Sequence, residues 1–226
     1  EITMAEPTIT FGTTTKFGSL TGWNPVGATV TKTKTRAVAL NGIGNEVASK
    51  VINEITEYSQ EFVANATDAP TIPPTLGALL GSVVLTGIRI STSATDYAKM
   101  TLTGHQHTTN AHADTLNQVT HGITISSGFG AVDFLGGTAG DNAAVESSTL
   151  NIQTGHTDVQ AGATGDHLIG QNHTANATAT TVWIGVPTAG IGDTWEETET
   201  GSTTESNTGH VRTTYTGAKS LTLAAP

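Results

Sequence analysis

The chain has no cysteine among its 226 residues, which excludes disulfides and thiolate metal ligands. Aromatic residues make up only 5% of the sequence, so a hydrophobic core must rely on Val, Ile, Leu and Ala. No apolar run approaches the ~20 residues that a membrane-spanning helix needs. The opening EITMAEPTITFG also lacks the basic start and apolar stretch of a signal peptide. We therefore expect neither a disulfide-stapled scaffold nor a membrane partner.

Charged residues are scarce as well, at 12% of the chain against about 25% in an average soluble domain. Threonine instead takes roughly one position in five. Because charged surface keeps protein chains apart, a monomer of this composition is poorly protected against self-association. Uncharged faces rich in threonine suit strand packing. The composition favours a chain whose surface is largely covered by copies of itself, and a secreted protein rich in small residues is the alternative.

Between Lys99 and Arg212 there is no lysine or arginine, yet this interval holds all eight histidines and eleven of the nineteen acids. Almost all of the net charge of -10 therefore comes from the second half of the chain. Such an imbalance predicts a surface with a negative field at neutral pH, which repels phosphate and attracts cations.

Familiar catalytic and nucleotide-binding motifs are missing too: G-x-S-x-G, H-E-x-x-H, the P-loop and the dinucleotide-binding glycine pattern do not occur. We predict that the protein is not an enzyme, with no catalytic residues, no cofactor-binding residues and no cofactor.

What the sequence does contain is a series of short β-like segments separated by turns rich in glycine. Residues 1–36 are interpreted as an extended N-terminal arm, and residues 37–226 as a single domain with a histidine-rich insertion at about 105–121. Residues 82–90, 97–104, 179–186 and 209–216 are predicted as strands. A loop is expected at about 187–207, and a short helix near 111–119. This spacing indicates a mainly β fold, an antiparallel β-sandwich or barrel with one or two short helices and long loops.

The segment 47–63 allows two interpretations. Its apolar residues recur at helical spacing, with Lys50 and Glu54 four positions apart. The same segment is rich in Val, Ile, Thr, Tyr and Phe, which is typical of strands. It follows the sequence Asn41-Gly42-Ile43-Gly44-Asn45, a predicted turn.

Four histidines fall in the predicted insertion: His105, His107, His112 and His121. On a strand, His105 and His107 would point to the same side, and with Asp114 nearby these imidazoles could bind zinc, iron or nickel. We favour the simpler interpretation, in which they are polar loop residues that hydrogen-bond to backbone carbonyls. The sequence prediction for metal ligands is accordingly none.

Three stretches together resemble the tail tube proteins of tailed bacteriophages: the hairpin sequence ALNGIGNEVASKVINEITEYSQEFV, the strand pair SVVLTGIRI and YAKMTLTG, and the closing HVRTTYTGAKSLTLAAP. The resemblance implies a virion structural protein that forms hexameric rings. It also implies that these rings stack into a tube through which DNA passes on ejection, and that the subunit contacts other tail proteins.

The charge pattern agrees with that resemblance, because lysine and arginine supply the nonspecific affinity of proteins for DNA. A channel lined with acids and without basic residues would let DNA slide. The run Glu196, Glu197, Glu199 and Glu205 is interpreted as a solvated loop, or alternatively as part of such a channel. The alternative function is an extracellular filament or adhesin subunit in which residues of the N-terminal arm complete a neighbour's sheet.

Overall fold

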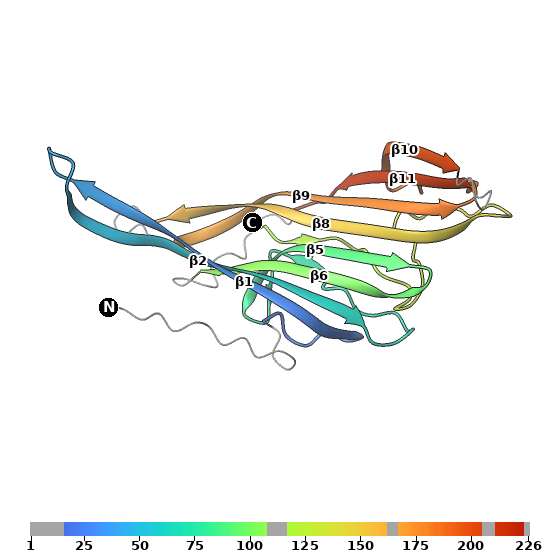
Figure 1. Cartoon of the computed structure of the whole chain (residues 1–226), viewed down its shortest axis with the longest axis horizontal. Helices are drawn as coiled ribbons and strands as arrows, with labels where there is room; N and C mark the ends of the chain where they lie inside the picture. The colour runs from blue at the N-terminus through green and yellow to red at the C-terminus, as the bar shows by residue number, and fades with distance from the viewer. Residues whose placement is uncertain (1–15, 108–116, 162–166, 205–210, 224–226) are drawn as a thin grey trace.

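The protein is an antiparallel β structure, shown in Figure 1. The computed structural model describes residues 16–107, 117–161, 167–204 and 211–223. Within these ranges there is no helix, and hence none that could cross a membrane. The short helix expected near 111–119 falls mostly outside them. The strands are β1 (Trp23–Leu40), β2 (Glu46–Ala64), β3 (Thr75–Leu76), β4 (Leu79–Leu80), β5 (Val83–Ser93), β6 (Asp96–His107), β7 (Val119–Thr120), β8 (Ala144–Gln160), β9 (His167–Ile184), β10 (Glu196–Thr204) and β11 (Val211–Ser220).

Nine of these strands form one sheet, in the order β1-β2-β6-β5-β8-β9-β11-β10, with the short β4 added beside β5. β3 and β7 pair separately as a small two-stranded sheet. The predicted pairing of residues 82–90 with 97–104 is confirmed, since β5 pairs with β6 across the turn that follows Ser93. The predicted strands at 179–186 and 209–216 overlap β9 up to Ile184 and β11 from Val211, and these two strands pair with each other.

The segment 47–63, which allowed both a helix and strands, belongs to β2. Gln60, Phe62 and Ala64 are buried and alternate with exposed or half-buried neighbours, which is the period of a strand rather than of a helix. β2 pairs with β1 on one side and β6 on the other, and these backbone hydrogen bonds override the helical spacing of its apolar residues.

The predicted turn at residues 41–45 is confirmed as the tip of the β1–β2 hairpin. Asn41 accepts hydrogen bonds from the backbone N–H groups of Ile43 and Asn45 through its side-chain oxygen, at 3.1 and 2.9 Å. Gly44 adopts a φ of 86°, in the left-handed region that glycine tolerates without steric cost. The first part of this hairpin includes residues 23–36 of the expected N-terminal arm, which pair with β2 in the same chain. Residues 1–15 of the arm lie outside the described residues.

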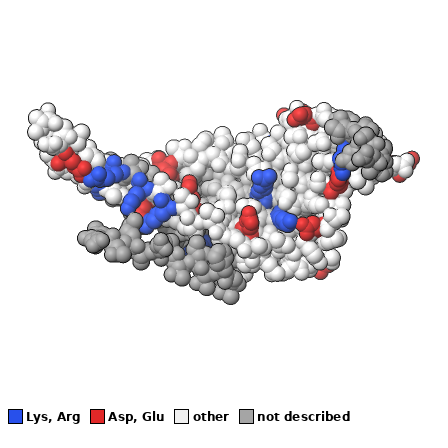
Figure 2. Space-filling model, in the orientation of Figure 1, with Lys and Arg blue, Asp and Glu red and all other residues white. Residues whose placement is uncertain are grey.

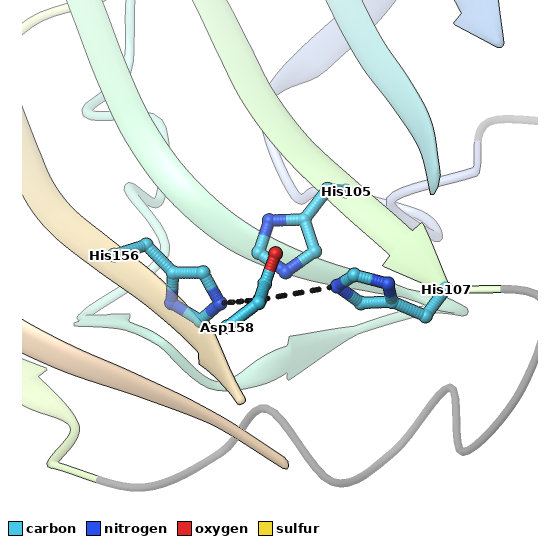
Figure 3. A group of neighbouring side chains, drawn as sticks. All are labelled: His105, His107, His156 and Asp158. Carbon is cyan, nitrogen blue, oxygen red and sulfur yellow. Dashed lines mark hydrogen bonds and ion pairs between the residues drawn. The ribbon is translucent and has the colours of Figure 1, made fainter. Parts of the chain in front are cut away.

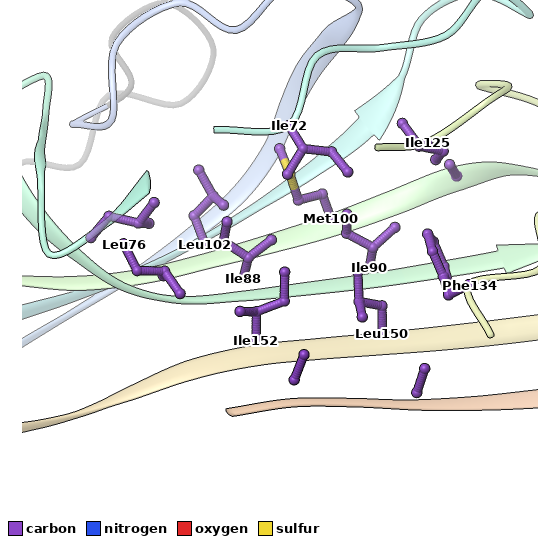
Figure 4. Packing of buried hydrophobic residues seen from close by; sticks show 14 of the residues in the cluster. Ile72, Leu76, Ile88, Ile90, Met100, Leu102, Ile125, Phe134, Leu150 and Ile152 are labelled. Atoms are coloured by element: carbon purple, nitrogen blue, oxygen red, sulfur yellow. The ribbon is translucent and has the colours of Figure 1, made fainter. Parts of the chain in front are cut away.

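The hydrophobic core covers one face of the central strands. Ile88 lies opposite Leu102 and Ile152 in the ladders, and Ile90 lies opposite Met100 and Leu150, so all six side chains share a face. The layer that packs on them consists mainly of loops, as Figure 4 shows for Ile72, Ile125 and Phe134. The small β3–β7 sheet adds Leu76 and Val119. Aliphatic side chains dominate this core, as the scarcity of aromatic residues predicts.

The expected loop at 187–207 is wrong in its second half. Residues 196–204 form β10, an edge strand that pairs only with β11 among the described strands. The side chains of residues 196–201 are exposed, and an edge strand in solvent needs no apolar alternation, which is why the sequence did not predict it.

Candidate functional site

A cluster of three histidines and one aspartate lies where the ends of β6 and β8 approach each other (Figure 3). His105 and His107 come from the last residues of β6, and His156 and Asp158 from the last part of β8. Each pair is spaced two residues apart, and alternate residues of a strand point to the same side. His105 and His107 therefore share a side, as expected for a strand, and the favoured interpretation that they are loop residues is wrong.

The two strands that supply the cluster are not neighbours, since β5 lies between them in the sheet. The last pair between β5 and β8 is Gly87 with Gln153, and β4 then takes the place of β8 beside β5. β8 continues to Gln160 together with β9, and β9 comes into contact with β2, the other neighbour of β6. This curling of the sheet brings the two pairs of side chains together.

The cluster is compact and converges on the carboxylate. Oδ1 of Asp158 lies 2.9 Å from Nε2 of His156 and 3.2 Å from Nε2 of His107. The ring of His105 packs against both other imidazoles, with centroid distances of 4.5 Å to His156 and 5.3 Å to His107. One ligand atom from each of the four residues lies within 4.8 Å of the other three. Three imidazoles and a carboxylate thus surround a single point.

Burial and charge act in opposite directions on the carboxylate. Burial by itself would raise the pKa of Asp158, because a charged carboxylate loses hydration. The hydrogen bonds from His107 and His156, together with the positive charge that these rings can carry, outweigh this effect and hold the pKa of Asp158 far below its usual range. Asp158 is therefore ionised at neutral pH, and the cluster contains a fixed negative charge.

A second layer of polar groups fixes the orientation of His156. Its Nδ1 lies 3.2 Å from the side-chain oxygen of Asn172, a fully buried residue of β9. The side-chain N–H₂ of Asn172 points toward the backbone oxygen of Asn117 at 3.4 Å, and that of Asn117 donates to the backbone oxygen of Asn172 at 3.1 Å. Because the side-chain nitrogen of Asn172 faces Asn117, its side-chain oxygen is the atom that faces His156.

Of the other histidines singled out in the sequence, His121 takes no part in the cluster. His121 is buried, and its ring nitrogens bond to the backbone of Pro73 and Ile123, which is the loop role expected for it. His112, like Asp114, lies outside the described residues. His156, Asp158 and Asn172 were missed by sequence reasoning. The available signal was the spacing His-x-Asp at 156–158, which repeats the spacing His-x-His at 105–107.

The described acids between Lys99 and Arg212 do not form one group. Asp133 accepts hydrogen bonds from Leu135 and Thr181, and Glu146 forms a two-bond ion pair with Arg212, with distances of 2.6 Å. Glu196, Glu197 and Glu199 are exposed on β10. On the face seen in Figure 2, acidic side chains lie among Lys and Arg. Among the described residues, the negative charge is thus divided among structural contacts, the histidine cluster, one sheet edge and exposed loops.

Compared with known proteins, the sequence matches no protein-family model and no curated protein sequence.

Proposed function

We propose that the protein is a structural subunit that assembles with copies of itself into a tube of the kind found in the tails of tailed bacteriophages. The observation that carries this proposal is the β1–β2 hairpin, which extends well beyond the body of the molecule (Figure 1). An isolated two-stranded hairpin is marginally stable in water. A long projecting hairpin is understandable when a neighbouring subunit covers it.

The outer half of the hairpin carries the side chains expected of a contact surface. Val38 lies opposite Ser49 in the ladder, so Val51, two residues from Ser49, lies on the same face, and Val47 lies at the β-bulge next to the turn. These three valines are exposed, as are Leu40 and Ile43 close to the turn. Contiguous exposed apolar patches are uncommon on monomers and mark interaction sites. A second copy of this chain is the partner that the low overall charge favours.

The two edges of the large sheet provide a further means of joining copies. β1 and β10 are the outer strands, and each has one side without a strand partner among the described residues. Lys32, Lys34 and Arg36 lie on β1, whereas β10 carries Glu196, Glu197 and Glu199. Pairing of β10 in one copy with β1 in the next is a head-to-tail contact of complementary charge. Repeated around an axis, such a contact closes a ring and completes a barrel between copies.

An acidic edge also suits passage of DNA through the tube. Exposed glutamates on β10 repel phosphate, and the described residues between 100 and 211 offer no lysine or arginine to bind it. Where β10 borders the lumen, it lets the DNA slide without sticking. The tube is favoured over the strand-donation filament because residues 23–36 are already paired with β2.

Negative-stain electron microscopy of the purified chain, combined with light scattering after gel filtration, tests the proposal. We expect rings or tubes with a central channel. Val47→Asp should shift the protein toward monomers, because it places a charge in the contact surface. Val186→Asp is the matched control, since Val186 is equally exposed (65% against 63% for Val47) but lies in the loop after β9. A chain that stays monomeric at all concentrations, or that forms solid fibres, would contradict a tube.

A further inference from the structure

We infer that His105, His107, His156 and Asp158 bind one divalent transition-metal ion of the zinc class, which fastens the end of β6 to the end of β8. The site does not depend on the proposed assembly, because all four residues belong to a single chain. Two of the ligands come from each strand, and the two strands are separated by β5 in the sheet.

The spacing of the side chains is close to that of a metal centre. In a tetrahedral zinc site with bonds of about 2.0–2.1 Å, the ligand atoms lie about 3.4 Å from one another. Nε2 of His156 and Nε2 of His107 lie 2.9 and 3.2 Å from Oδ1 of Asp158. The largest separation among the four ligand atoms is within 4.8 Å. These separations, from 2.9 Å to at most 4.8 Å, lie on both sides of the tetrahedral value.

The hydrogen-bond partners of His156 call for a cation. Its Nδ1 faces the side-chain oxygen of Asn172, and its Nε2 faces the carboxylate of Asp158. Both partners are acceptors, whereas a neutral imidazole has only one N–H to donate. A second proton on the ring would satisfy both acceptors, and so would a metal ion bound to Nε2: Nδ1–H then donates to Asn172, and the ion joins Nε2 to the carboxylate. Asn172 would then orient a ligand in the way that outer-shell partners do in metal proteins.

The donor set selects the class of metal. Three imidazoles and one carboxylate suit zinc and the neighbouring late transition metals, whereas calcium and magnesium prefer oxygen ligands alone. Four protein ligands complete a tetrahedral sphere, which is typical of structural rather than catalytic zinc. His105 and His107 are buried, with exposed fractions of 6% and 1%, so a bound ion would be largely shielded from solvent.

The position of the site between β6 and β8 indicates that a bound ion would have a structural role. Beyond Gln153, β8 no longer pairs with β5, and the direct link through the sheet ends. Coordination by residues of both strands restores a connection between the two halves of the sheet at this point. Binding to the folded chain alone would then stabilise it by mass action.

The test begins with a chain purified without a histidine tag, stripped with a chelator and titrated with Zn²⁺ and with Co²⁺. We expect one ion per chain, visible absorption bands of four-coordinate Co²⁺, and a melting temperature that rises with Zn²⁺ concentration. His107→Asn and Asp158→Asn should each weaken Zn²⁺ affinity by about 100-fold or more, because each removes a ligand.

His173→Asn is the matched control. His173 lies on β9 close to the cluster and contacts Thr157 of β8, but it is exposed and outside the ligand set. It should keep one tightly bound ion. Retention of full affinity in both ligand variants would overturn the site. So would failure of the native chain to bind a stoichiometric ion at micromolar concentrations, and this measurement decides the question even if a ligand variant does not fold.

Discussion

His121 is a buried histidine whose hydrogen bonds require the neutral ring. Its Nε2–H donates to the carbonyl oxygen of Pro73 at 2.8 Å, and its Nδ1 accepts from the N–H of Ile123 at 3.0 Å. A second proton on the ring would turn Nδ1 into a donor and break the bond to Ile123. Burial lowers the pKa of His121, and the charge of Lys219 acts in the same direction against the opposing effect of the bond to Pro73.

This environment predicts a loss of stability in mild acid. The pKa of His121 is lower in the folded chain than the ordinary value of about 6.5 that it regains on unfolding. Below that value the unfolded chain binds a proton that the folded chain does not, so the free energy of unfolding falls as the pH drops from about 7 toward 5. We expect His121→Gln to reduce this slope in urea unfolding series.

His173→Gln serves as the comparison, since His173 is exposed. It should leave the pH dependence close to that of the native chain. Equal slopes for native chain and His121→Gln would show that the ring is not held neutral.

At the same scale, the sequence indicated the shared side of His105 and His107 but not their partners. A two-residue spacing fixes the direction of neighbouring side chains on one strand. It carries no information on which other strand will face them. His156 and Asp158 are separated from His107 by about fifty residues and meet it only because β8 leaves β5 and curls toward β6.

At the level of the elements, a chain of hydrogen-bonded polar side chains holds the loop between β7 and β8 against the sheet. Thr181 of β9 donates a 2.8 Å hydrogen bond to Asp133 in this loop. Ser148 of β8 lies 2.8 Å from the Thr181 hydroxyl and donates to the carbonyl oxygen of Thr180. Thr181 and Ser148 are buried, so each bond replaces contacts with water that are no longer available.

Thr181→Val should therefore destabilise the protein by about 1–3 kcal/mol, because it keeps the shape of the side chain but leaves the half-buried carboxylate of Asp133 and the buried hydroxyl of Ser148 short of a partner. Chemical denaturation measures the loss. Thr178→Val, at an exposed position of the same strand, is the control and should change the free energy of unfolding by less than about 0.5 kcal/mol. Similar effects of the two variants would mean that the Asp133 contact contributes little.

For elements as for residues, what could be predicted depends on burial. β5 and β6 are largely buried, and their runs of aliphatic residues identified both strands and their pairing. Residues 196–201 of β10 are exposed to solvent, and the strand has no apolar pattern in its sequence. In β2 the apolar residues of the projecting half need not face a core within this chain, which is why their spacing also matched a helix.

At the level of the whole molecule, the described strands form a sheet with a basic strand at one edge and an acidic strand at the other, and the proposed self-association depends on these two edges. Free strand edges invite uncontrolled pairing unless they are covered. The ion pairs of Lys32 with Glu54 and of Arg36 with Glu46 tie part of the β1 charge to β2. Lys32 and Arg36 remain largely exposed and available to a second copy.

Reversal of three charges on β10, Glu196→Lys with Glu197→Lys and Glu199→Lys, should weaken assembly while leaving the circular dichroism spectrum unchanged. The reason is that the altered edge repels β1 of the next copy. Sedimentation velocity gives the distribution of oligomers. The control makes the same change in net charge at three exposed loop acids, Asp68→Lys, Asp141→Lys and Asp193→Lys, and should assemble like the native chain. Equal loss in both variants would implicate net charge rather than the edge.

The sequence by itself determined the mainly β architecture, an aliphatic core, the hairpin turn at residues 41–45 and the concentration of negative charge in the second half. These properties follow from local preferences and from composition. Only the tertiary structure decided that β2 is a strand, that residues 196–204 form an edge, and that the acids between Lys99 and Arg212 are divided among different roles. It alone joined two separate two-residue spacings into one histidine–aspartate cluster, because the curl of a sheet depends on the pairing of all its strands.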